Sequence, residues 1–154
     1  MGQQQLLLLV LSTVIVGLAT VAGIQAFSEN QAQATQDALI QRTTQIASDL
    51  VAADSKPSQL GGIDLTTSNT TQWANAIGLS SASSIDADGA GDGASCSIND
   101  GTGDGPANGS YSISPDAYVE CTAGSGSSAE VEVGIDPDAS GDKIETAIVS
   151  VASV

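Results

Sequence analysis

The first 27 residues of the chain are almost entirely apolar. Residues 6–26 contain no charge and no proline, and only Ser12, Thr13, Thr20 and Gln25 interrupt the Leu, Val, Ile, Ala and Gly residues. At about 1.5 Å per residue, a helix over this run is roughly 30 Å long, which matches the hydrocarbon core of a bilayer. The pattern therefore predicts an apolar helix over residues 1–27 that can cross a membrane.

The helical pattern continues after this run but becomes amphipathic. Residues 28–53 contain no Gly and no Pro, and their apolar residues recur in steps of three, four or seven. We expect one helix from about residue 2 to about residue 53, ending before Lys56 and Pro57, because the residue before a proline is pushed out of the α region. Its second half, residues 28–54, presents one apolar face, made of Ala32, Leu39, Ile46, Leu50 and Ala53.

The next part of the chain is irregular. Residues 55–65 contain Pro57 and two glycines and predict a connector. The lone Trp73 is expected to pack this connector onto the core, with a ligand-stacking site as the alternative. A short helix is expected over residues 71–77, with Asn69 or Thr70 as its N-cap and glycine as its stop. Residues 80–109 are small, polar and rich in glycine, and predict a long surface loop held at Cys96.

From residue 110 onward the period of the pattern changes to two. Alternation over residues 110–113, 117–121, 130–135 and 144–154 predicts three or four short strands in an antiparallel meander. Because one face of such a sheet needs a cover, we expect the amphipathic half of the helix to pack on it. The predicted fold is α+β, with one very long N-terminal helix and a head over residues 55–154, divided into an αβ-loop (55–109) and an antiparallel sheet (110–154).

The charge is strongly one-sided. Eighteen acidic residues against Arg42, Lys56 and Lys143, with no histidine, give a formal charge of −15. Nucleic acid and anionic membrane surfaces are therefore poor partners, since both need clustered cations. Concentrated salt screens the self-repulsion of such a head, so we interpret the surface as adapted to high salt. An ordinary acidic secreted protein is the alternative.

The two cysteines, Cys96 and Cys121, favour a disulfide beyond the membrane, with two buried thiols as the alternative. Closing this loop would stabilise the fold by roughly 3–4 kcal/mol. A zinc site is excluded for want of a third thiol or a histidine. Many carboxylates are present, but the sequence shows no apolar pocket that would raise the pKa of one of them, so no enzymatic activity is expected.

Two surface chemistries remain open. Carboxylates separated by glycines, at Asp86, Asp88 and Asp92, are typical of calcium loops, although the closing glutamate of an EF-hand is missing. A solvated acidic loop is the alternative, and no other cofactor is expected. The Asn-X-Ser/Thr pattern occurs at Asn69 and Asn108, which are possible glycosylation sites.

This architecture resembles the type IV pilin family and its pseudopilin relatives. The opening Gly2-Gln3-Gln4-Gln5-Leu6-Leu7-Leu8-Leu9-Val10 is similar to the processing region of that family, where a prepilin peptidase cuts after a glycine ahead of the apolar stretch. The resemblance implies insertion in the inner membrane before assembly, then export by pilus assembly machinery into a cell-surface filament of identical subunits.

The polar residues at the start of the helix depart from the family pattern. Many bacterial pilins carry a glutamate at mature position five, which is thought to meet the N-terminal amine of a neighbouring subunit. If Met1 is the mature start, this position is Gln5, which can accept a hydrogen bond without full charge assistance. If cleavage follows Gly2, then Gln3 comes first and Leu7 is fifth. We prefer the first numbering. We also expect residues 1–27 to be retained, because no basic residue precedes the apolar run as in a secretory signal peptide.

In a filament, the apolar helix would be surrounded by copies of itself. Glycines and alanines along it let helices approach closely, and Gly17 and Gly23 are places where it could loosen during assembly. Three functions stay open: a major structural subunit, a minor pilin or pseudopilin of a secretion or uptake machine, and a monomeric membrane-anchored binding domain. The residues expected to pack in a filament core are Leu6, Leu9, Val10, Val14, Gly17, Leu18, Val21, Gly23 and Phe27.

Overall fold

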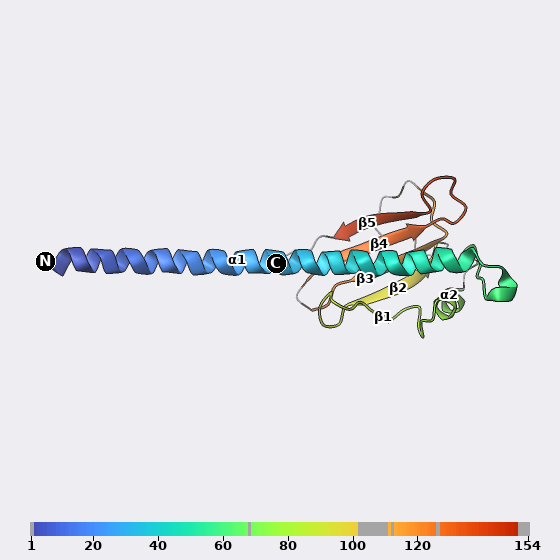
Figure 1. The fold of residues 1–154 in the computed structure, drawn as a ribbon, viewed down its shortest axis with the longest axis horizontal. Coiled ribbons are helices and arrows are strands. Elements are labelled where there is room, and N and C mark those ends of the chain that lie inside the picture. The colour runs from blue at the N-terminus through green and yellow to red at the C-terminus, as the bar shows by residue number, and fades with distance from the viewer. Residues whose placement is uncertain (1, 68, 102–110, 112, 126, 151–154) are drawn as a thin grey trace.

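The computed structural model describes the chain except for residues 1, 68, 102–110, 112, 126 and 151–154. The fold is α+β, as predicted: one long helix, α1 (Gly2–Asp54), packs on a five-stranded antiparallel sheet. Its 53 residues make a helix about 80 Å long. Figure 1 shows that the first half of α1 projects beyond the head, while the second half lies along the sheet.

The end of α1 agrees with the sequence prediction to within one residue. Its last turn loosens where Lys56 N donates to Ala53 O at 3.2 Å, and Pro57 follows at once. A proline cannot supply the next backbone N–H, so the helix stops here. The chain then forms a single 3-10 turn, η1 (Ser58–Leu60), at the end of the molecule farthest from the N-terminus (Figure 1).

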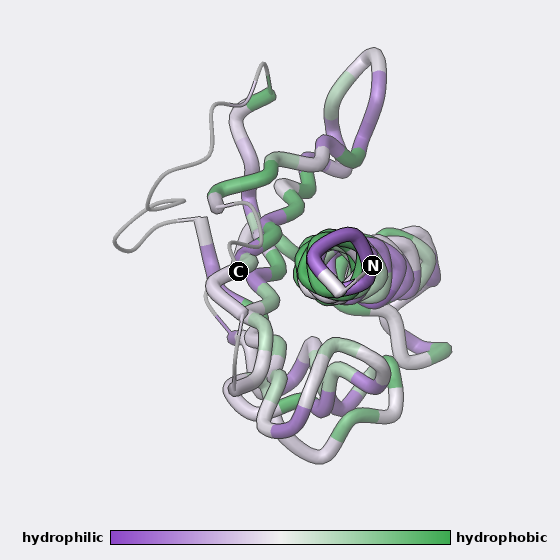
Figure 2. Tube along the Cα trace, turned by 90° about the vertical axis from the view of Figure 1, so that its left-hand side faces the viewer, coloured by the Kyte–Doolittle hydropathy of each residue, from purple (hydrophilic) through white to green (hydrophobic). Residues whose placement is uncertain are grey.

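The sheet is a simple meander in which each strand pairs with the next one along the chain. The strands are β1 (Ile85–Asp86), β2 (Ser95–Asp100), β3 (Ala117–Thr122), β4 (Glu130–Ile135) and β5 (Ile144–Ser150). Helix α1 lies over β3, β4 and β5, and Figure 2, which looks along α1, shows the helix on one side of the sheet. The sheet therefore has a helix-facing side and an outer side.

The core forms between the amphipathic half of α1 and the helix-facing side of the sheet. Leu39, Ile46, Leu50 and Ala53 of the predicted face are buried, and Ala32 is half-buried. Thr43 is also buried within this face, and its hydroxyl donates to the carbonyl oxygen of Leu39. The strands contribute alternate apolar residues, which are Cys96, Ile98, Ala117, Val119, Cys121, Val131, Val133 and Ile135.

The connector is packed as the sequence predicts. The short helix α2 (Thr70–Ala76) starts at Asn69, whose side chain accepts from Gln72 N at 3.2 Å. Trp73 is 1% exposed, and its indole N–H donates to Asp64 O at 3.1 Å. This bond ties α2 to the connector, which confirms the packing role expected for the tryptophan.

The prediction for residues 80–109 was wrong in part. Strands β1 and β2 lie inside this stretch, and β2 pairs along its whole length with β3. Its sequence, Ser-Cys-Ser-Ile-Asn-Asp, has few apolar residues, so pairing and the disulfide hold it in the sheet. Conversely, Tyr111 and Ile113 belong to no strand, and the last strand ends at Ser150 within the described residues.

Candidate functional site

The feature of the molecule with the clearest chemical meaning is the bare half of α1, which we call the rod (residues 6–27). Each large apolar side chain of the rod is 50% to 70% exposed. By contrast, the buried residues of α1, such as Leu39, Ile46 and Leu50, all lie in its second half. A surface of this size and composition needs an apolar environment outside the chain, because contiguous apolar patches this large mark membrane or protein contacts.

The three hydroxyl groups of the rod are satisfied within the helix. Ser12 Oγ donates to Leu9 O at 2.9 Å, Thr13 Oγ1 to Val10 O at 2.9 Å, and Thr20 Oγ1 to Gly17 O at 2.8 Å. An apolar solvent penalises unsatisfied donors by several kcal/mol. These bonds remove that penalty, so the rod is compatible with membrane insertion.

All the residues expected to pack in a filament core lie on the rod and are exposed. Gly17 and Gly23 lie inside an unbroken helix, and a Cβ at either position would meet no atom within 4 Å. Their proposed roles in helix approach and in loosening stay predictions. Gly2, Gln3 and Gln5 form the exposed first turns of α1, while Met1 lies outside the described residues.

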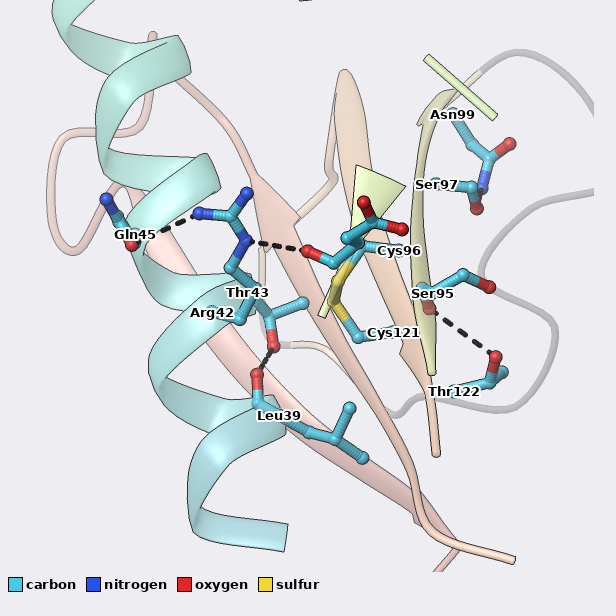
Figure 3. Close-up of a disulfide and its surroundings, with 11 residues drawn as sticks. Leu39, Arg42, Thr43, Gln45, Ser95, Cys96, Ser97, Asn99, Cys121 and Thr122 are labelled. Carbon is cyan, nitrogen blue, oxygen red and sulfur yellow. Dashed lines mark hydrogen bonds between the residues drawn. A yellow bond between two sulfur atoms is a disulfide. The ribbon is translucent and has the colours of Figure 1, made fainter. Parts of the chain in front are cut away.

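The disulfide predicted between Cys96 and Cys121 is present. The two residues are directly paired in the register of β2 and β3, with Cα atoms 4.0 Å apart, and are at most 1% exposed. Figure 3 shows the bridge on the helix-facing side of the sheet, near Leu39 and Thr43. Arg42 crosses the same region, where its Nε donates to Asp86 O at 3.3 Å. The bridge therefore joins β2 to the part of the sheet that α1 covers.

The acidic loop is built around backbone contacts. Asp86 ends β1, while Asp88 and Asp92 are exposed in the turn that follows. Asp92 O accepts from Ser125 N and from Ser125 Oγ, both at 2.9 Å, and a Cβ on Gly124 would lie 2.2 Å from that oxygen. Among the described residues, no group of three His, Cys, Asp or Glu side chains is placed to hold a metal. The structure thus does not gather the carboxylates that the calcium hypothesis requires.

Of the two possible glycosylation sites, Asn108 lies outside the described residues and Asn69 is exposed. Asn69 Oδ1 caps α2, and its Nδ2 donates to Gln72 Oε1 at 3.2 Å. A glycan would attach at Nδ2, so modification leaves the capping oxygen in place.

Removing this cap is expected to destabilise the head. Asn69→Ala should cost about 1 kcal/mol, because the side-chain oxygen no longer satisfies the Gln72 amide. The loss is measurable by urea unfolding of the unglycosylated chain. Thr71→Ala is the matched control, since Thr71 is exposed and completes the acceptor pattern without capping the helix. Equal losses in both variants would contradict the capping role.

The outer side of the sheet holds a buried glutamate, Glu132, whose burial the sequence pattern does not predict. Glu132 is only 2% exposed, and burial, followed by the charge of Glu120, raises its pKa to about 7. Burial also raises the pKa of Glu120 and of Asp116, and burial followed by the charge of Glu132 raises that of Tyr111. The alternation around β4 indicated only that Glu132 faces away from the helix.

Comparison with known proteins leaves the family open. No family model, curated protein or solved structure matches this chain. Within the described residues, one helix, α1, is long and apolar enough to cross a membrane by length and composition. Its combination with a small antiparallel sheet is compatible with the shape of a pilin.

We expect the one-sided charge to make the stability of the head depend on salt. Every charged residue lies at Glu29 or beyond, so the whole charge of −15 belongs to the amphipathic half of α1 and the head. Raising salt from 0.1 M to 1 M shortens the Debye length from about 10 Å to about 3 Å. We expect the melting temperature of the chain in detergent to rise by about 5 °C. Near-ultraviolet circular dichroism of Trp73 reports this, and an unchanged midpoint would contradict the prediction.

Proposed function

We propose that this chain is the structural subunit of an extracellular type IV pilus-like filament, held together by its rods. The observation that carries the proposal is the rod itself, whose large apolar side chains are 50% to 70% exposed along a helix that projects beyond the head. The role is structural and calls for no catalytic group. It also gives the rod two successive environments, lipid before assembly and other rods afterwards.

The energetic argument concerns what surrounds the rod. Burial of apolar surface contributes about 25 cal/mol per Å2, or roughly 1.5–3 kcal/mol for each fully buried Leu or Ile. Lipid and a bundle of rods both meet this need, so transfer from one to the other does not expose the rod to water. A contact between different surfaces of identical subunits, repeated without closing, generates a fibre.

The distribution of charge fits an arrangement with rods inside and heads outside. The rod carries no charge, and the acidic head can remain in water. Packing heads side by side brings like charges together, which salt screens. The proposal therefore predicts acidic heads on the filament surface and assembly that is favoured by salt.

The test is to isolate filaments sheared from the cell surface, view them by electron microscopy, and identify their main subunit and its N-terminus by mass spectrometry. The proposal expects abundant filaments built from this chain. Filaments that contain it only in trace amounts would indicate a minor pilin or a pseudopilin instead. A chain that stays monomeric when detergent is removed in high salt, and is absent from filaments, would overturn the proposal in favour of a membrane-anchored domain.

A further inference from the structure

The outer side of the sheet is crossed by a short segment, Tyr111 and residues 113–116, which we call the strap. A Cβ on Gly134 of β4 would lie 3.1 Å from the Tyr111 ring and 3.2 Å from Pro115 Cβ, so the strap rests directly on this glycine. Ile113 N donates to Glu145 Oε2 at 3.2 Å, and Asp116 N donates to Ile135 O at 2.9 Å. The strap is thus held to both β4 and β5.

An ionisable side chain is buried on this side of the sheet. Glu132 is 2% exposed, and its Oε1 has no hydrogen-bond partner in the described part of the chain. The Tyr111 hydroxyl is also buried and lies beside Glu132, too far for a well-formed hydrogen bond but close enough to lower the pKa of this carboxyl, against the larger effects of burial and of the charge of Glu120, which raise it. The titratable side chains around these two groups are Tyr118 and Glu120 of β3, Glu130 of β4 and Glu145 of β5.

None of these neighbours is a cation. Glu120 lies directly opposite Glu132 in the register, and Glu130 lies two residues away on the same side of β4. A buried carboxylate without a cation or a full set of donors is costly, and binding a proton removes most of that cost. A bound metal is a poorer explanation, because the described residues offer no group of three ligands.

We propose that Glu132 acts as a pH switch for the strap, which lies closed on the sheet while the carboxyl is protonated and lifts when it ionises. Lifting of the strap lets water reach the carboxylate of Glu132. It also uncovers the part of the outer side of the sheet on which Tyr111 lies. This inference concerns the head alone and does not depend on filament formation.

The direction of the response follows from proton linkage. The closed form holds its proton up to a pKa of about 7, whereas an open, hydrated carboxyl loses it near the ordinary value of 4.5. The closed form therefore binds more protons between these values, and closure weakens as the pH rises through this window. Between pH 5 and pH 8 the ratio of open to closed strap should rise roughly 70-fold.

Hydrogen exchange of the full-length chain in detergent tests the switch. Labelling times are scaled at each pH for the intrinsic exchange rate, and peptides from the strap are compared with peptides from β3 and β4. We expect protection of the Ile113 and Asp116 amides to fall from pH 5 to pH 8 while the strands stay protected. A parallel loss in the strands would overturn the proposal, because it would reflect global stability.

Substitution locates the sensor. Glu132→Gln keeps the shape but cannot ionise, so its strap should be as protected at pH 8 as that of the unmodified chain at pH 5. Glu130→Gln is the matched control, since it removes a half-buried carboxyl from the same side of the same strand and should leave the response in place. A response that persists in Glu132→Gln, or one that follows added calcium at constant pH, would overturn the proposal.

A second measurement applies if Glu132→Gln does not fold. Carbon-13 labelling of the glutamate carboxyls in the unmodified chain follows the titration of Glu132 directly. A midpoint near 7 supports the switch, and a midpoint near 4.5, the ordinary value, overturns it.

Discussion

Val14→Asp is expected to abolish filament formation and to reduce membrane insertion of the chain. Val14 lies near the middle of the rod and is 52% exposed, so its side chain faces whatever surrounds the helix. An aspartate at the centre of a membrane helix costs about 3 kcal/mol, which is roughly a hundredfold in an equilibrium constant. The measurements are the yield of sheared filaments and the fraction of chain that resists alkaline extraction from membranes.

The same helix offers a matched control. Gln33→Asp adds the same charge to α1 at an exposed position beyond the rod, and should leave insertion and assembly near normal. The contrast separates the environment of the rod from a general effect of added charge. Normal filament yield from Val14→Asp would mean that the rod is not buried among its copies.

Removing the disulfide is expected to destabilise the head by about 3–4 kcal/mol. The bridge closes a loop with a sequence separation of 25, and the chain-entropy model gives this magnitude for a loop of that length. Cys96→Ala with Cys121→Ala should therefore unfold at much lower urea concentration in detergent. The remaining head relies on a core rich in alanine, so this loss is a large part of its stability.

A second pair separates the covalent link from packing. Both cysteines are buried, so alanines also leave unfilled volume beside α1. Cys96→Val with Cys121→Val restores volume without restoring the link. If the loop constraint matters, both pairs lose similar stability, whereas full recovery in the valine pair would assign the effect to packing.

The long helix could be predicted because its signals are local. Residues 6–26 carry no charge. In the residues that follow, apolar side chains recur at a helical period, and this period correctly predicts that Leu39, Ile46 and Leu50 are buried. Thr43 was missed because a hydroxyl looks polar in the pattern, although in a helix it can donate to a carbonyl one turn back.

The strands were harder to predict than the helix, because their environment depends on tertiary contacts. The alternation of Glu130, Val131, Glu132 and Val133 predicted β4 and its helix-facing side, but it gave both glutamates the same solvent-exposed environment. Only tertiary structure distinguishes them, because Glu132 is buried beside the strap while Glu130 is half-buried. β2 was missed for a related reason, since its place in the sheet depends on pairing with β3.

The disulfide and the rod could be foreseen in outline from the sequence. Two cysteines in a head beyond an apolar segment favour a bridge, and their pairing is confirmed. The roles of Gln3 and Gln5, of the acidic loop and of the glycosylation sites depend on molecules outside the chain. For these, side-chain types alone indicate which contacts are chemically possible.

The sequential order of the sheet has a consequence for biosynthesis. The rod leaves the ribosome before the strands, and the strands follow in the order in which they pair, so no strand waits for a distant partner. Leu39, Ile46 and Leu50 emerge before the strands that cover them and remain exposed until β3 to β5 arrive. Folding of the head thus ends with its last strand, after the membrane-compatible part of the chain has already been made.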